Sequence, residues 1–155
     1  MRPLLLALSL LCVTPALAED LVPRDGWVVV NTAKSHADLT ADLKQAAKAQ
    51  NMGIVTQASP TATARKRGID IPENRVIGVF NNDFAVKVLA TSTAAMIEAP
   101  IRFYITENTN GTATLSYKKP SEVFAPYYSE GGDTLVKLAD SLDLVFDRIT
   151  VTATR

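Results

Sequence analysis

Arg102 is the residue whose surroundings in the sequence most strongly suggest binding chemistry. It stands in the segment Ile101-Arg102-Phe103-Tyr104-Ile105, where residue types alternate as in a β-strand with one buried face. The alternation puts Arg102 and Tyr104 on the face opposite Phe103 and Ile105. If helices cover that face, the guanidinium is partly buried and requires a partner. Two partners stay open, a carboxylate of the chain in a structural ion pair and the carboxylate of a ligand.

Two polar side chains complete this candidate site. Tyr104 offers a hydroxyl on the face that carries Arg102. Asn82 offers an amide just after the strand-like segment 75–80. We therefore expect a small anion or carboxylate to be anchored by Arg102, with Asn82 and Tyr104 as hydrogen-bonding neighbours. We assign no catalytic residue.

The remaining reactive side chains do not form a recognisable catalytic or metal site. His36 is the only histidine, and the only cysteine is Cys12, near the N-terminus. A zinc site needs three or four converging ligands, so we expect His36 to be a solvated surface residue and expect no metal. No Gly-x-Ser-x-Gly turn and no glycine-rich phosphate loop occurs, and we expect no cofactor. We expect the basic residues 65–67 to lie on the solvent-exposed face of a short helix.

Two helices and a strand are indicated by their apolar patterns. Ser35 is a suitable cap for a first helix that ends near Gly53, expected to be its left-handed residue. That helix has an apolar stripe, and a last helix after Gly131-Gly132 has a longer one. The segment 75–80 is apolar on both faces and is expected to be a strand in the middle of the sheet, covered on two sides. Asn82 or Asp83 is expected to cap the helix that follows it. The stripes are Leu39, Leu43, Ala46 and Ala47 in the first helix, and Leu135, Leu138, Ala139, Leu142, Val145, Phe146 and Ile149 in the last.

The segment from Ile101 to Tyr117 predicts a β-hairpin whose register can be argued. A two-residue turn at Asn110-Gly111 would pair apolar with polar residues across the strands. A three-residue loop, 109–111, instead pairs Ile105 with Leu115 and Phe103 with Tyr117, which keeps one face apolar. Gly111 suits the left-handed position of such a loop. We therefore predict the three-residue loop.

Along the chain, these patterns predict the order strand, helix, strand, short helix, strand, helix, hairpin and helix. This order predicts an α+β fold, a single two-layer sandwich in which helices pack on a mixed sheet of about five strands. We expect one domain over residues 27–155, preceded by a short segment, 19–26.

The first eighteen residues have the three parts of a secretory signal. Met1-Arg2 is a basic start, residues 4–13 are mostly apolar, and Ala16-Leu17-Ala18 is a small-residue cleavage site. Ten such residues fall short of the roughly 20 needed to cross a bilayer as a helix. We expect cleavage after Ala18, a periplasmic or secreted protein, and no membrane insertion after cleavage.

The charge balance argues against polyanionic partners. The chain has 16 basic and 16 acidic residues, and the predicted signal contains only Arg2 of these. A net charge of about −1 without long runs of either sign does not favour nucleic acid as a partner.

Several spaced residues resemble those of the bacterial and archaeal family known as domain of unknown function 302. The resemblance extends from about Trp27 to Ile149 and implies a compact α/β sandwich that pairs as a homodimer, with no reaction, substrate or cofactor. Two departures stand out. Ser59-Pro60 occupies the place where many members have Asp-His, and Asn81 and Asp83 replace the glycine and proline of the family's turn. The matching residues are Ala64-Arg65-Lys66-Arg67-Gly68, Phe80-Asn81-Asn82, Pro100-Ile101-Arg102, Gly111, Tyr117 and Pro120.

Three functions follow as hypotheses. We expect an exported, non-catalytic binding or interaction module of the cell envelope, with a small anionic ligand or a second copy of the chain as partner. The first alternative is a carboxylate-based hydrolase or isomerase, which would require two acids with separated pKa values in one pocket. The second is a structural subunit of an envelope complex, suggested by the aromatic loop near Tyr127.

Overall fold

The fold is built on one five-stranded sheet. The computed structural model describes residues 19–155, and the predicted signal peptide, 1–18, lies outside the described residues. The strand order is β1-β5-β4-β3-β2, and every neighbouring pair is antiparallel. The strands are β1 (Trp27–Asn31), β2 (Gly53–Ala58), β3 (Asn74–Phe80), β4 (Ile101–Glu107) and β5 (Ala113–Lys118).

The predicted α+β sandwich with five strands is confirmed, but the sheet is antiparallel rather than mixed. A parallel contact would need two strands of the same direction side by side. β1 and β2 run in the same direction, but they lie at opposite edges of the sheet and do not pair. Each forms its ladder with a strand of opposite direction, β5 or β3.

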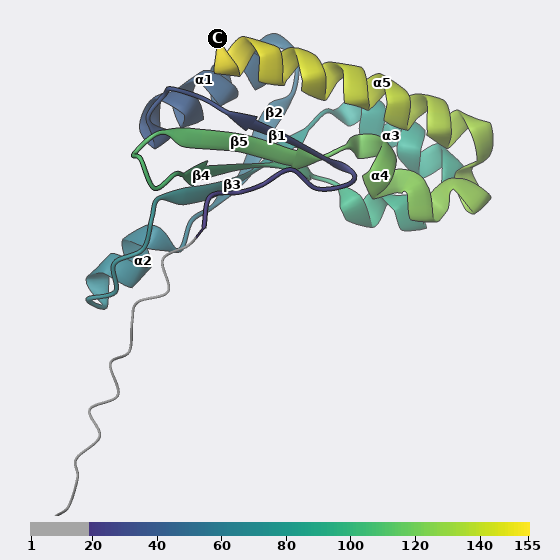
Figure 1. The fold of residues 1–155 in the computed structure, drawn as a ribbon. Helices are drawn as coiled ribbons and strands as arrows, with labels where there is room; N and C mark the ends of the chain where they lie inside the picture. Colours follow the sequence, from purple (N-terminus) through teal and green to yellow (C-terminus); the bar gives the residue numbers. More distant parts are fainter. Residues whose placement is uncertain (1–18) are drawn as a thin grey trace, which may run out of the picture.

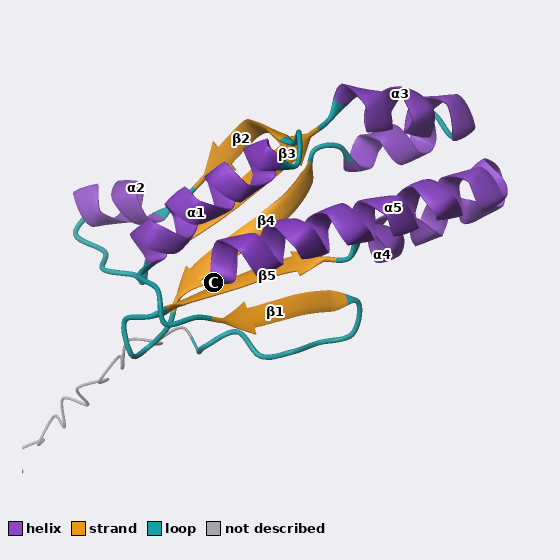
Figure 2. Cartoon of the chain, turned by 90° about the horizontal axis from the view of Figure 1, so that it is seen from above, coloured by secondary structure: helices purple, strands orange, loops and turns teal. Residues whose placement is uncertain are grey.

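Helices cover one face of this sheet. Figures 1 and 2 show α1 (His36–Ala49) and α5 (Tyr128–Thr154) lying above the strands. α5 contains a kink at Gly132, whose φ is 56°. Among residues 19–155, no helix crosses the middle of the opposite face (Figure 1). The remaining helical segments are α2 (Thr61–Lys66), α3 (Asn82–Thr91), α4 (Pro120–Phe124) and two 3₁₀ turns, η1 (Ala94–Glu98) and η2 (Ala125–Tyr127).

The core lies between the sheet and α1 and α5. All four residues of the predicted α1 stripe are buried, as are those of the α5 stripe except Leu138, which is partly buried. Phe103 of β4 stacks on Phe146 of α5, with ring centroids 4.5 Å apart. The helical periodicity therefore identified the two helix faces that build the core.

Polar residues at the helix ends differ partly from the prediction. The Ser35 hydroxyl accepts a hydrogen bond from the backbone N–H of Asp38 (3.1 Å), so Ser35 caps α1 as predicted. The left-handed residue after α1 is Asn51, with a φ of 57°, and not Gly53. The cap of α3 is Asn81, whose side-chain oxygen accepts from the Phe84 N–H, and not Asn82 or Asp83.

The hairpin has the predicted register. Phe103 pairs with Tyr117 and Ile105 with Leu115. The backbone N–H of Asn108 donates to the carbonyl of Thr112 (2.8 Å), which closes a three-residue loop. Gly111 in that loop has a φ of 81°.

The predicted central place of the strand at 75–80 is wrong. β3 is next to the edge strand β2, and β4 holds the centre because the β4–β5 hairpin fills the space between β3 and β1. β3 is also covered on one face only, since α1 and α5 lie on the same side of the sheet (Figure 1). Its apolar residue Val76 is therefore on the open face, where it is partly buried.

Candidate functional site

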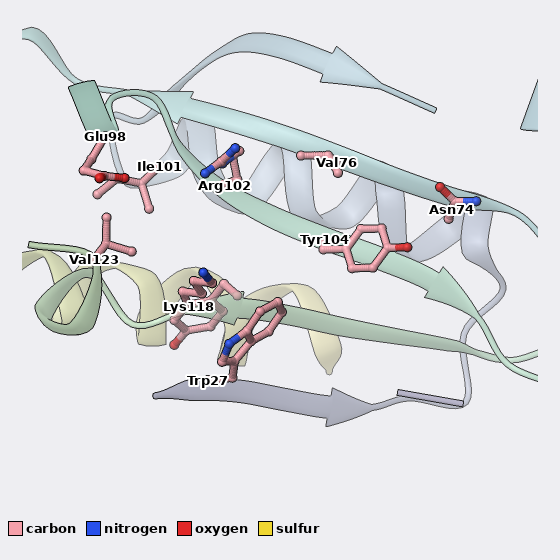
Figure 3. Close-up of a pocket in the computed structure, with 10 residues that line it drawn as sticks. Trp27, Asn74, Val76, Glu98, Ile101, Arg102, Tyr104, Lys118 and Val123 are labelled. Atoms are coloured by element: carbon pink, nitrogen blue, oxygen red, sulfur yellow. The ribbon is translucent and has the colours of Figure 1, made fainter. Parts of the chain in front are cut away.

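The open face of the sheet contains a cavity of about 330 Å³ at the β1, β5, β4 and β3 strands (Figure 3). Strand alternation directs Asn74, Val76, Arg102 and Tyr104 into it, away from α1 and α5. Ile101 and Tyr117, which also line it, belong to the core. The helical segments η1 and α4 close one end through Glu98 and Val123. The lining residues are Trp27, Asn74, Val76, Glu98, Ile101, Arg102, Tyr104, Tyr117, Lys118 and Val123.

Arg102 lines this cavity and is exposed. The sequence did not show whether helices cover the face of β4 that carries Arg102. In the structure α1 and α5 pack on the opposite face, so they do not bury the guanidinium. The ion pairs of residues 19–155 are Lys34–Asp42 and Arg65–Glu73. The structural ion pair considered for Arg102 is therefore not found in the described part of the chain, and its donors face the cavity.

Tyr104 lies on the same face, two residues further along β4 (Figure 3). It is partly buried, and its cross-strand neighbours are Val76 and Ser116. Asn82 does not join them. It is exposed in the first turn of α3, beyond the end of β3, and does not line the cavity. The structure therefore brings together two of the three predicted residues.

Sequence reasoning missed the other half of the cavity, which comes from β1 and β5. Trp27 pairs directly with Lys118 across these strands. The Lys118 Nζ lies 5.7 Å from the centroid of the Trp27 ring, and the Arg24 guanidinium carbon lies 5.2 Å from it. Cations at these distances are attracted to the ring face. The pairing of β1 with β5 joins residues about ninety positions apart, and no local pattern indicated it.

The electrostatic balance of the cavity favours an anion. Arg102 and Lys118 are its two cations, and Glu98 is its one carboxylate. Glu98 already accepts a hydrogen bond from the Tyr127 hydroxyl (2.8 Å), and this bond raises the pKa of Tyr127. The two acids that a carboxylate-based mechanism requires are thus not both present in this cavity.

His36 is not the solvated residue that was predicted. Only 8% of its surface is exposed, because the first turn of α1 packs against the loop end of the sheet. Burial lowers its pKa, so the imidazole is neutral at pH 7. No group of three or more His, Cys, Asp or Glu residues in the described part of the chain is arranged to hold a metal ion.

None of the helices that the structure describes is long and apolar enough to span a membrane.

Comparisons with known proteins identify the fold. The family model described as "Domain of unknown function DUF302" matches residues 28–149. The crystal structure of an uncharacterized conserved protein DUF302 from Bacillus stearothermophilus is similar, with a TM-score of 0.72 and 18% sequence identity. The match covers 85% of this chain and 100% of that one. No curated protein matches the chain.

Proposed function

The chain belongs to the DUF302 family, a family of unknown function, and we propose that this member binds a small organic carboxylate with an apolar body on the open face of its sheet. The observation that carries the proposal is the cavity around Arg102. Its guanidinium is exposed there without an ion-pair partner among residues 19–155. A planar guanidinium binds a carboxylate through two parallel hydrogen bonds.

The rest of the cavity supports a ligand that is partly apolar. Val76, Ile101 and Val123 supply aliphatic surface, and the Trp27 ring supplies an aromatic one. A volume of about 330 Å³ lies at the lower end of the range for small-molecule sites. An acid with an aromatic ring or a short aliphatic chain fits this combination, with its carboxylate at Arg102 and Lys118.

The binding is proposed to be non-catalytic and to take place outside the cytoplasm. Export rests on the basic, apolar and small-residue parts of residues 1–18. The family resemblance adds a second copy of the chain as an alternative occupant of the open face. The experiment must therefore separate ligand binding from dimer formation.

The single tryptophan makes the cavity directly observable. Trp27 is the only tryptophan of the sequence and lines the cavity, so its fluorescence reports on occupancy. Phenylacetate and hexanoate, added to the purified protein, should change the Trp27 emission in a saturable way. Phenylacetamide, which has the same shape without the charge, should bind at least about tenfold more weakly, since a hydrogen bond to a charged group contributes roughly 1.5–3 kcal/mol.

Two variants assign the effect to the predicted anchor. Arg102→Gln should weaken phenylacetate binding by about tenfold or more. Lys87→Gln removes an exposed charge on α3 outside the cavity and should leave the affinity unchanged. Equal binding of acid and amide would refute the proposal. So would a dimer, seen by analytical ultracentrifugation, that excludes every probe from Trp27.

A further inference from the structure

The charged side chains of the cavity on the open face lie together at one of its ends. Phe103 pairs with Tyr117, and continuing this register by one residue places Arg102 opposite Lys118. Glu98, the carboxylate of the cavity, lies at the same end (Figure 3). A ligand carboxylate bound by the two cations is therefore held at this end.

The other end of the cavity has neutral polar side chains. Tyr104 is opposite Val76, and Asn74 is two residues further along β3, in the direction away from Arg102. The Tyr104 hydroxyl points toward the end where Asn74 lies (Figure 3). Arg102 is opposite Gly78, so the backbone positions of the charged anchor and of Asn74 are about 13 Å apart along the strands.

Each of these two neutral side chains has a free hydrogen-bonding atom. The Asn74 amide nitrogen donates to the Pro72 carbonyl (3.2 Å) and to Thr61 Oγ1 (3.4 Å). Because a carbonyl oxygen only accepts, the first bond fixes the orientation of the amide and leaves Asn74 Oδ1 as an acceptor. At Tyr104, the Ser116 hydroxyl bonds the backbone carbonyl (3.3 Å), and the Tyr104 hydroxyl bonds no residue of 19–155.

Both free atoms are accessible from the cavity. Tyr104 and Asn74 line it and are only partly buried. The enclosed polar atoms without a partner in the described part of the chain belong to other residues, so neither the Tyr104 hydroxyl nor Asn74 Oδ1 is sealed in the protein. A ligand that reaches this end is therefore able to bond both atoms.

We propose, as an extension that rests on the proposed function, that the ligand of this cavity has a hydroxyl group at the end opposite its carboxylate, as in a para-hydroxylated aryl acid. Arg102 and Lys118 bind the carboxylate. The ligand hydroxyl donates to Asn74 Oδ1 and accepts from the Tyr104 hydroxyl. Tyr104 and Asn74 are then the residues that determine specificity.

Charge and length both favour this class of ligand. Asn74 Oδ1 is an acceptor, and the cations of the cavity are at the opposite end, so a second carboxylate would have no partner here. An ammonium would share the cavity with Arg102 and Lys118, which repel it. With a hydrogen bond of about 2.9 Å at each end, one benzene ring between the carboxylate and the hydroxyl gives the ligand a length that suits this separation.

The single tryptophan provides a readout specific to this cavity. Trp27 lines it and is the only tryptophan of the sequence, so its indole N–H gives one NMR signal that reports on the site. 4-Hydroxyphenylacetate should bind about fivefold or more tightly than phenylacetate, because it forms additional neutral hydrogen bonds. 2-Hydroxyphenylacetate has the same atoms, but its hydroxyl stays beside the acid group. It should bind no more tightly than phenylacetate.

Tyr104→Phe assigns the preference to the predicted residue. The change removes only a hydroxyl without a partner in residues 19–155, so the melting temperature and the phenylacetate affinity should stay the same. The advantage of the para hydroxyl should fall to about twofold or less. A purely structural role would change the affinities for both acids by the same factor.

Tyr128→Phe is the matched control. Its hydroxyl donates to the Ser121 carbonyl (2.8 Å), and Tyr128 does not line the cavity. The loss of this bond should lower the melting temperature, but the ratio of the two affinities should equal that of the parent protein.

The outcomes separate this ligand class from the broader binding function. Phenylacetate binding that depends on Arg102 without any gain from the para hydroxyl would overturn the ligand class and leave the proposed function standing. Equal gains from the two hydroxyl isomers, or an unchanged para advantage in Tyr104→Phe, would overturn it as well. If no acid shifts the Trp27 signal, the proposed function and the ligand class are both wrong. A para advantage that Tyr104→Phe removes and Tyr128→Phe keeps establishes the assignment.

Discussion

Arg102 lies directly opposite Gly78 in the β3–β4 ladder. Because Gly78 has no side chain, no cross-strand side chain covers the base of the arginine, and the guanidinium extends into the cavity. The space beside Gly78 is nevertheless occupied. A Cβ there would overlap the Thr56 hydroxyl and come within 2.9 Å of Pro100 Cγ.

Gly78→Ala should therefore destabilise the protein. Overpacking of this kind costs about 1–3 kcal/mol in the free energy of unfolding, measured by urea denaturation. Gly53→Ala is the matched control in the neighbouring strand, where a Cβ would meet only the Phe80 carbonyl oxygen at 3.5 Å. Equal stability of the two variants would show that the site beside Gly78 is not tightly packed.

Arg102→Lys should reduce ligand affinity without changing the fold. Lysine keeps the positive charge but loses the planar pair of donors, so phenylacetate should bind more weakly. The residue is exposed, and the free energy of unfolding should change by less than about 0.5 kcal/mol. A large drop in melting temperature with unchanged binding would instead make Arg102 a structural residue.

Gly111→Val should destabilise the β4–β5 hairpin. Gly111 has a φ of 81°, and no atom lies within 4 Å of a Cβ built there, so the cost comes from the backbone alone. A β-branched residue in this conformation costs about 1 kcal/mol or more. Gly111→Asn should cost less, because asparagine tolerates left-handed geometry. Similar urea midpoints for both variants and the parent protein would contradict the strain argument.

His36 should make the protein less stable as the pH falls below about 6.5. Burial lowers the pKa of His36 in the folded state, so above the unfolded value of 6.5 both states are neutral and the stability is complete. Between 6.5 and the lowered pKa, the unfolded state binds more protons and stability is lost. Glu73 and Glu107 oppose this shift, while Arg75 adds to it.

Thermal melts from pH 7.5 to pH 5 test this dependence. The His36→Gln protein should show a flatter profile in that range than the parent protein, because the carboxylates titrate in both. If the melting temperature depends on pH in the same way in the His36→Gln and parent proteins, the imidazole is solvated in the folded state and the prediction is wrong.

The predicted signal sequence should be removed on export, so that the mature chain begins at Glu19. Intact-mass measurement of protein recovered from the periplasm or the medium checks cleavage after Ala18, which the small residues at 16–18 predict. A different N-terminus, or recovery only in the membrane fraction, would refute the expected export.

The features that the sequence determined correctly are those set by near neighbours along the chain. The stripes of α1 and α5 repeat every three or four residues, and a helix turns such a repeat into one buried face. The hairpin register followed from the alternation of Ile105 and Leu115 around a short loop, because a shift of one residue would turn every apolar side chain away from the core. These patterns also supported the α+β class and the number of strands.

Tertiary structure decided which residues share an environment. Alternation in β4 separates Arg102 from Phe103, but it does not say which face the helices cover, since that depends on where α1 and α5 pack. The partnership of Trp27 with Lys118 depends on β1 pairing with β5, and the burial of His36 depends on α1 meeting the loop end of the sheet. Each is a contact between segments far apart in the chain, and the free energy that selects it comes from the packing of the whole domain rather than from any local pattern.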